Sequence, residues 1–337
     1  MKMLPPLCFA IFASVAVSGT AVADAFWQAL PAQTPSPAAN PTTPAKVELG
    51  RMLFHDKRLS ESATVSCASC HVLSEGGAGH KPTSTGVHGE AGGRNAPTVW
   101  NVGFLTSFYW DGRASSLEDQ VRTQLINPID MGMKDSAYVA ARIRAIPGYL
   151  PYFERAFGGS DSISEANIGR AIAAFERTLI TPDSPYDRYV KGDKAALTDQ
   201  QLRGMAEFRT SGCSRCHQGP AFDGPALTAG TVFTMKFPTN MRSPFVATYS
   251  LIDDLGRIEW TGKEADRNQW RVPSLRNLKY TAPYMHNGFV PTLADAVRVM
   301  GSTELSRTLT DPEVADLVSF LEALSGPLPA VPAPTLP

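Results

Sequence analysis

Apolar residues recur at helical spacing in four segments of the chain, whereas alternating strand patterns are scarce. Two of these segments are residues 45–56 and 197–210, and in the second Thr198 and Gln201 stand at the spacing of a capping box. The apolar faces expected of these two helices are Leu49, Met52 and Leu53 in the first and Leu202, Met205 and Ala206 in the second. Proline and glycine, 27 of each, crowd the regions between helices. The pattern predicts a mainly α fold with long loops.

The other two helical segments, residues 164–179 and 310–324, each close one half of the chain. Their expected apolar stripes are Ile168, Ala171, Ile172, Phe175 and Leu179, and Val314, Leu317, Val318, Leu321 and Leu324. Each half also contains one Cys-x-x-Cys-His motif, followed by Phe175 or Phe320 after 104 or 103 residues. This repeated order predicts two domains of the same kind, residues 46–182 and 183–326, related by internal duplication.

The ends of the chain differ from this middle part. Residues 1–25 combine Lys2, a short apolar core and small residues at a cleavage site, which is typical of a secretory signal peptide and predicts export to the periplasm. Residues 26–45 and 327–337 are Pro-rich, and we expect an extended N-terminal arm and a C-terminal tail. No later segment is apolar enough for a membrane span, and a net charge of −1 gives no reason to expect nucleic-acid binding.

Four of the five cysteines lie in the two repeated motifs, and Cys8 lies in the leader. The motifs are Cys67-Cys70-His71 and Cys213-Cys216-His217. Cys-x-x-Cys-His is the attachment signal for c-type haem, in which two thiols bond to the haem and the histidine binds its iron. A disulfide would not need the histidine, and zinc would need further ligands near each motif. The sequence therefore predicts two c-type haems with His71 and His217 as axial ligands. The two duplicated domains are accordingly expected to be cytochrome c-like haem domains.

Beyond these motifs, the chain resembles the bacterial di-haem cytochrome c peroxidases and the related MauG-like maturation enzymes, from about Val47 to about Gly326. The segments that carry the resemblance are LFHDKRLSESATVSCASCH, GGRNAPTVWN, FYWDGRASSLEDQ, NPIDMG, IPGY, FERTLITPDSPYDRYVKGD, GCSRCHQGP, VPSLRNLKYTAPYMHNG and TLADAVRVMG. The resemblance implies an enzyme in which the first haem reacts with peroxide and the second haem receives electrons.

The resemblance also assigns roles to single residues. Fourteen residues after His286, Met300 matches the methionine that closes the second haem, although Met285, Met235 or Met241 would compete for this role on sequence alone. Asp130 matches a carboxylate, usually Glu, that moves a proton between the peroxide oxygens; local sequence alone favours a turn with an N-cap Asp here. Trp110 matches a tryptophan that relays electrons between the haems, and Asn95, Thr281 and Pro283 match positions that hold a calcium ion by oxygen atoms.

One departure concerns the histidine that caps the first haem of the peroxidases at rest. An ungapped alignment places Val87 at this position, with His88 one residue further along. Either His88 serves after a shift of the loop, or the first haem has no such cap. His80 is a weaker candidate, and we expect His55 to be a solvated surface residue. The Gly-rich loop itself is closer to the MauG-like branch.

The function that the sequence favours is a periplasmic di-haem peroxidase, which takes electrons from a monohaem cytochrome c or a cupredoxin and reduces hydrogen peroxide to water. An alternative is a MauG-like oxidase that uses peroxide to modify residues of a partner protein; those enzymes have Tyr where this chain has Met300. A third interpretation is an electron-transfer cytochrome, which would need both irons closed. Relatives are often dimers, so a homodimer is an expectation by analogy.

Overall fold

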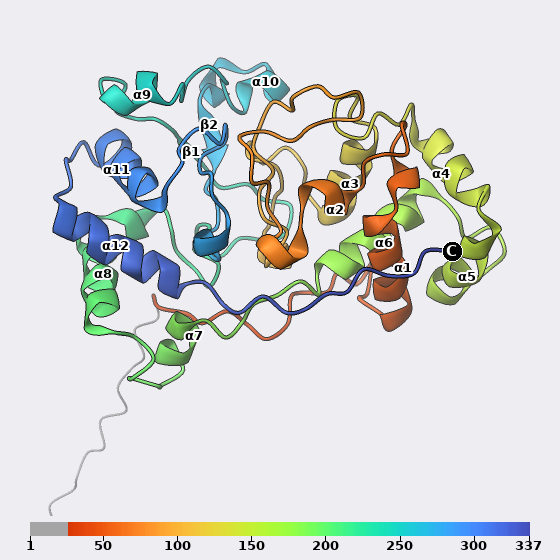
Figure 1. The fold of residues 1–337 in the computed structure, drawn as a ribbon, viewed down its shortest axis with the longest axis horizontal. Helices are drawn as coiled ribbons and strands as arrows, with labels where there is room; N and C mark the ends of the chain where they lie inside the picture. The colour runs from red at the N-terminus through yellow and green to blue at the C-terminus, as the bar shows by residue number, and fades with distance from the viewer. Residues whose placement is uncertain (1–25) are drawn as a thin grey trace, which may run out of the picture.

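The computed structural model describes residues 26–337, so the predicted signal peptide and Cys8 lie outside the described residues. As predicted, this part of the chain is mainly helical, and its two halves lie side by side in Figure 1. The helices of the first half are α1 (Pro44–His55), α2 (Cys67–Cys70), α3 (Leu117–Leu125), α4 (Ser136–Arg144), α5 (Leu150–Phe157) and α6 (Glu165–Glu176). Those of the second half are α7 (Pro185–Val190), α8 (Asp199–Thr210), α9 (Pro244–Thr248), α10 (Ile258–Thr261), α11 (Leu293–Glu304) and α12 (Asp311–Ala323).

In the first half, α1 packs across α6 through the apolar faces that the sequence predicted. The helix α1 begins after Thr43, whose hydroxyl accepts a hydrogen bond from the backbone N–H of Lys46. Leu49 is fully buried in the contact. At Gly50 the two backbones nearly touch, because a Cβ there would lie 1.9 Å from the carbonyl oxygen of Ala171. The missing side chain therefore allows this close crossing.

In the second half, α8 packs across α12 in the same way. The predicted capping box is present, with Thr198 and Gln201 bonding each other's backbone N–H groups. Gly204 occupies the crossing point, and a Cβ there would lie 1.9 Å from the carbonyl oxygen of Asp316. Each half is thus built around one helix pair with a glycine at the contact.

The residues of the predicted apolar stripes of α6 and α12 are buried, except Val318, which is partly buried. For α8, the prediction is wrong at one residue. Ala206 is exposed, and Phe208 is the buried residue instead. The face toward α12 runs through Gly204, Met205 and Phe208. Because each helical residue turns about 100°, Ala206 points away from this face.

The strands form one small antiparallel sheet in the second half. β1 (Thr234–Lys236) pairs with β2 (Gln269–Arg271), and Met235 lies opposite Trp270. Residues 71–116, between α2 and α3, contain only short turns and isolated bridges in place of longer elements. Among residues 26–337, none of the helices has the length and apolar character needed to cross a membrane.

The N-terminal arm belongs to both halves. Trp27 packs into the aromatic core of the second half, and the Leu30 backbone N–H donates to a carboxylate oxygen of Asp187 at 2.8 Å. Further along, the hydroxyl of Thr34 donates to the carbonyl oxygen of Arg177 at 2.9 Å. The arm then enters α1 at Pro44. It therefore connects the core of the second half to the first helix of the first half.

The C-terminal tail crosses in the opposite direction. From α12 it runs along the edge of the molecule to the first half, and its end lies beside α5 in Figure 1. Leu328 and Val331 pack against the core of the first half. The carbonyl oxygen of Pro337 accepts a hydrogen bond from Arg58 at 3.0 Å. Each terminal segment thus contributes apolar side chains to the half that is farther from it in sequence.

Candidate functional site

The first Cys-x-x-Cys-His motif forms α2 and the residue that follows it. Ser66 and Ser69 form a capping box at the start of this single turn. The ring nitrogen Nδ1 of His71 donates to the carbonyl oxygen of Gly77 at 3.0 Å. Because a carbonyl can only accept, Nδ1 carries the proton and Nε2 keeps its lone pair. Burial also lowers the pKa of His71, so the ring is neutral and suited to bind iron through Nε2.

The second motif has the same arrangement on a short 3₁₀ turn, Cys213–Arg215. The Nδ1 of His217 donates to the carbonyl oxygen of Phe222 at 3.0 Å, and the His217 backbone N–H donates to Cys213. His217 is buried, and burial lowers its pKa as well. Both motifs therefore present a neutral imidazole whose orientation is fixed by a backbone carbonyl.

The four cysteines of the motifs are half-buried, and no disulfide joins them in residues 26–337. Burial raises the pKa of Cys213 to about 11 and raises that of Cys67 further, so the thiols are neutral. Within residues 26–337, no three His, Cys, Asp or Glu side chains gather closely enough to hold a metal ion by themselves. Two thiols beside one histidine in each motif are the donor set that covalent attachment of a c-type haem requires.

A cavity of about 280 Å³ opens beside the second motif and is lined mainly by apolar side chains. Cys213, Cys216 and His217 lie on its wall. His286 also lines it, is 3% exposed, and has an Nε2 without a hydrogen-bond partner among the described residues. A mainly apolar cleft whose wall includes a buried polar atom without a hydrogen-bond partner fits a haem, which combines an apolar ring with charged propionates.

Met300, on α11, lines this cavity together with His217. Met235 and Met285 line it too, whereas Met241 is 47% exposed. The cavity therefore brings three of the four competing methionines near the second motif. The assignment of Met300 as the iron ligand remains a prediction.

Trp110 comes from the first half but lines the cavity of the second. Its indole N–H donates to the carbonyl oxygen of Asn95 at 2.8 Å. The backbone N–H of Asn95 in turn donates to the carbonyl oxygen of His286 at 2.8 Å. Trp110 is therefore held at the boundary between the halves, where the predicted relay would have to lie.

The three predicted calcium ligands line the same cavity, although they come from segments almost 190 residues apart. The side-chain amide N–H of Asn95 donates a hydrogen bond to the carbonyl oxygen of Lys81 at 3.0 Å. The side-chain oxygen Oδ1 of Asn95 remains available to bind a cation. Thr281 and Pro283 are half-buried. Asn95, Thr281 and Pro283 thus line one cavity, and calcium binding by them remains a prediction.

Asp130 lies close to the first motif. Burial is the main influence there, raising the pKa of Cys70 and lowering that of His71, and the nearby negative charge of Asp130 makes a smaller upward contribution to both. It follows an Asx turn in which the Asn127 side chain accepts hydrogen bonds from the backbone N–H groups of residues 129 and 130. Its Oδ2 accepts a hydrogen bond from the Gln124 side chain at 2.8 Å. A Cβ at Gly92 would lie 3.5 Å from Oδ1, so the Gly-rich loop passes over the other oxygen.

The same loop places Val87 inward and His88 outward. Val87 is buried, and its backbone N–H donates to the carbonyl oxygen of Ile129 at 3.0 Å. The His88 side chain is 55% exposed, and its Nε2 lies 3.4 Å from a carboxylate oxygen of Glu61. In this arrangement Val87, and not His88, is the loop residue that faces the interior.

The remaining two histidines differ in exposure. The Nε2 of His80 lies 3.7 Å from Glu75, and its side chain is 39% exposed. His55 was expected on the surface, but it is half-buried, and its ring packs against Phe54 and Phe175. Its position at the end of α1 turns the ring toward the crossing of α1 and α6.

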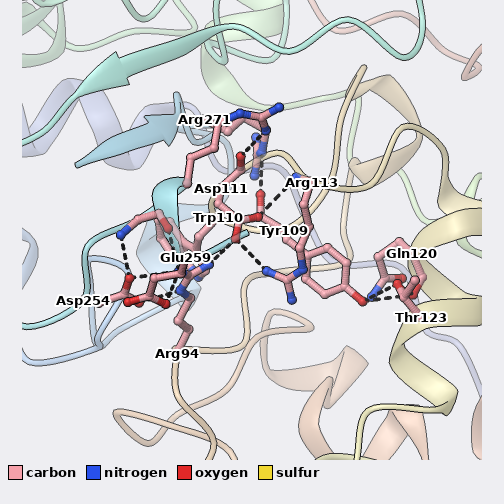
Figure 2. Close-up of polar contacts among 12 residues, drawn as sticks. Arg94, Tyr109, Trp110, Asp111, Arg113, Gln120, Thr123, Asp254, Glu259 and Arg271 are labelled. Carbon is pink, nitrogen blue, oxygen red and sulfur yellow. Dashed lines mark hydrogen bonds and ion pairs between the residues drawn. The ribbon is translucent and has the colours of Figure 1, made fainter. Parts of the chain in front are cut away.

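One group of residues beside the site had no recognisable pattern in the sequence. The Arg94 side chain, next to the predicted ligand Asn95, makes ion pairs with Asp111 and Asp254. It also lies over the Trp270 ring, which stacks on His286 at 4.0 Å. Figure 2 shows the ion pairs of Arg94 with Asp111 and Asp254 next to Trp110. Only the adjacency of Arg94 to a candidate ligand could have drawn attention to it.

Comparisons with known proteins agree with this site. The family described as Di-haem cytochrome c peroxidase matches residues 44–195. Cytochrome c551 peroxidase of Nitrosomonas europaea is 40% identical over 304 residues, which cover 90% of this chain and 86% of that protein. Methylamine utilization protein MauG of Methylorubrum extorquens is 35% identical over 360 residues, covering 98% and 96% of the two chains.

Among solved structures, a MauG-like protein associated with microbial copper homeostasis has a TM-score of 0.76 and 31% identity. The match covers 88% of this chain and 95% of the other. Family membership implies two c-type haems, in agreement with the two motifs, and peroxide as the substrate class. Since a cytochrome c551 peroxidase is 40% identical to this chain and is covered over 86% of its own length, this chain belongs to the di-haem cytochrome c peroxidase family and is an oxidoreductase of that type.

Proposed function

We propose that the protein reduces hydrogen peroxide to water in the periplasm, using electrons from a small redox protein. One hydrogen peroxide, two electrons and two protons form two water molecules. The observation that carries the proposal is the inequality of the two motif sites. The carboxylate of Asp130 lies beside the first motif, whereas methionines line the cavity of the second. When bound, two unequal haems would supply the redox chemistry: one would store an electron and the other would react with peroxide.

The second site is the proposed point of electron entry. Cys213 and Cys216 would hold the haem covalently, and His217 and Met300 would bind its iron. A thioether opposite an imidazole favours the reduced iron and so raises the reduction potential. A monohaem cytochrome c or a cupredoxin is the proposed donor, because either delivers one electron at a time. Trp110, on the wall of the same cavity, would pass electrons toward the first site.

The first site is the proposed place of peroxide reduction, with the haem held by Cys67, Cys70 and His71. There Asp130 would take a proton from one peroxide oxygen and return it to the other. Its Oδ2 is held by Gln124, so Oδ1 is the atom proposed to carry the proton. Because Asp is one methylene shorter than the Glu that is usual in the family, the proton would travel directly or through a water molecule.

Calcium is proposed to join the two halves through Asn95, Thr281 and Pro283. Oxygen donors suit this ion, and the cavity wall brings the three residues together. The predicted leader supports export to the periplasm. The matching helix pairs, each crossing at a glycine, support the duplication of one haem-binding unit. A homodimer is proposed by analogy with relatives.

The alternative function is MauG-like oxidation of residues on a partner protein. The inward position of Val87 supports it, because a first haem without a histidine cap would be open at rest. The likeness to a solved MauG-like protein points the same way. Met300 favours the peroxidase, since a thioether stabilises the reduced iron whereas the Tyr of MauG-like enzymes stabilises higher oxidation states.

The experiment that tests the proposal compares absorption and electron paramagnetic resonance spectra of the exported holoenzyme, both fully oxidised and half-reduced. Peroxide turnover is then measured with a reduced monohaem cytochrome c. A peroxidase should turn over with this donor, and its half-reduced form should contain one high-spin haem. Failure to turn over, combined with two low-spin haems in both states, would leave an electron carrier instead.

A further inference from the structure

Arg94 joins the two halves of the molecule through one side chain. Its guanidinium forms a two-pronged ion pair with Asp254 of the second half, with nitrogen–oxygen distances of 2.6 and 2.9 Å. A third nitrogen contact, at 2.6 Å, goes to Asp111 of the first half. The side chains of Arg94, Asp254 and Asp111 are only 16%, 18% and 2% exposed. This is a charge cluster largely removed from water, where geometry is strongly constrained.

The cluster surrounds Trp110. Asp111 directly follows Trp110 in the sequence, and Asn95, which accepts the indole hydrogen bond, directly follows Arg94. Arg94 therefore fixes both the segment that carries the indole and the segment that accepts its hydrogen bond. Figure 2 shows the Arg94 and Asp111 side chains on one side of the backbone at Trp110 and the Arg271 side chain on the other.

Two other arginines of the second half, Arg271 and Arg257, donate hydrogen bonds to the backbone of residues 109–111. The backbone N–H of Arg271 donates to the carbonyl oxygen of Trp110 at 2.9 Å, and its Nε donates to Tyr109 at 3.1 Å. Arg257 donates to the carbonyl oxygen of Asp111 at 2.8 Å. Residues 109–111 are thus a first-half segment whose carbonyl groups are satisfied by second-half arginines. Rigid placement of Trp110 relative to the second cavity follows from these contacts.

Arg94 also contacts the wall of that cavity. Its guanidinium lies 4.9 Å from the centre of the Trp270 ring, and Trp270 stacks on His286. Trp270, His286 and Trp110 all line the cavity proposed to hold the second haem. A displacement of Arg94 would therefore move the relay and the cavity wall relative to each other.

We propose that Arg94 is a positioning residue for electron transfer between the haems, acting through Asp111 and Asp254 to hold Trp110 across the boundary of the two halves. The inference rests on the proposed function, in which Trp110 relays electrons. Electron transfer and proton transfer both depend steeply on placement, and a misplacement of about 1 Å can slow a catalysed step by about 100-fold. Arg94 touches neither motif, so its effect should be on the rate between the haems, with haem attachment unchanged.

The test uses the holoenzyme with one electron added, and follows the redistribution of that electron between the two haems by rapid absorbance spectroscopy. In Arg94→Met we expect this rate to fall at least about tenfold, with both haems attached and their oxidised spectra unchanged. Arg94→Lys, which keeps the charge but loses the planar fork, should recover part of the rate. Asp254→Asn is a milder variant that should fold and should also slow the transfer.

The matched control is Arg203→Met. Arg203 makes a two-pronged ion pair with Asp316 at 2.9 and 3.1 Å, but this pair is on the exposed surface between α8 and α12. Its removal should leave the transfer rate unchanged. A double variant at Arg94 and Asp254 should slow transfer by less than the product of the two single effects, because both changes break the same interaction.

The variant Trp110→Phe distinguishes the proposed relay role of Trp110 from the proposed positioning role of Arg94. If Trp110→Phe slows the transfer while Arg94→Met and Asp254→Asn keep the normal rate, the positioning role is refuted and the relay stands. If Trp110→Phe itself leaves the rate unchanged, the relay is refuted and the role of Arg94 with it. A slow Arg94→Met enzyme that has lost haem, together with an unaffected Asp254→Asn enzyme, would also overturn the inference by showing a general structural defect.

Discussion

The two glycines at the helix crossings provide a quantitative test of the fold. A methyl group at Gly204 would lie 1.9 Å from a backbone carbonyl oxygen of α12 and 2.6 Å from its carbon. Ordinary contacts of this kind are about 3.5 Å or longer, so the helices would have to separate by more than 1 Å. No flexible side chain can relieve the clash, because the nearest atoms belong to the backbone.

The magnitude follows from two opposing effects. Overpacking of a well-packed contact typically costs about 1–3 kcal/mol, and a backbone clash belongs at the upper end of this range. Alanine is favoured over glycine in a helix by about 1 kcal/mol. We therefore expect Gly204→Ala to lower the free energy of unfolding by about 2 kcal/mol, which corresponds to a fall in melting temperature of roughly 4–8 °C for a unit of this size.

The assay is thermal unfolding of the holoenzyme, followed by circular dichroism at 222 nm. Gly50→Ala should behave like Gly204→Ala, because its added methyl group would also lie 1.9 Å from a carbonyl oxygen. Gly169→Ala is the control: it lies inside α6, but its nearest neighbour, the carbonyl oxygen of Glu118, would be 3.4 Å away. This control should be neutral or slightly stabilised. Melting of Gly204→Ala at or above the wild-type temperature would refute the reasoning about the crossings.

Four further predictions concern single sites. Met300→His should lower the reduction potential of the second haem by a large margin, because imidazole favours oxidised iron more than a thioether does; an unchanged redox titration would discard the ligand assignment. Asp130→Asn should slow peroxide turnover by about 100-fold or more without abolishing peroxide binding, and near-normal kcat would exclude the proton-transfer role. Deleting residues 327–337 should lower the free energy of unfolding by about 1–3 kcal/mol, since two apolar side chains leave the first core, and an unchanged urea midpoint would contradict this. Burial raises the pKa of Glu176 from 4.5 to about 8, so the folded state holds this proton more tightly and stability should fall as pH rises between these values; Glu176→Gln should remove that fall, and melting curves with the same pH dependence as wild type would argue against it.

The sequence was informative where the signal is local. Helical spacing located α1, α6, α8 and α12, and the paired motifs predicted the number of haems that family membership implies. The prediction for Ala206 is wrong because helical spacing alone does not identify the side of α8 that contacts α12. Gly204 marks that side, since a close helix crossing requires a small residue. A stripe has a width of several residues, so tertiary contact decides which edge is buried.

Other features depend on contacts between distant residues, for which one sequence contains no pattern. Arg94 and Asp254 are 160 residues apart and meet only when the two halves are assembled. The Pro-rich ends predicted an extended backbone, but their composition does not indicate that Trp27 and Val331 pack into opposite cores. The inward position of Val87 likewise depends on how the Gly-rich loop meets residue 129.

The crossed terminal segments have a consequence for how the protein matures. Leu328 and Val331, which pack against the core of the first half, are synthesised long after the rest of that core, and Trp27, which packs against the core of the second half, is synthesised long before it. Neither core can therefore reach its final packing while the chain is still being made, however early the first motif is synthesised. The core beside the first motif stays open until residues 328–331 have been added to the chain.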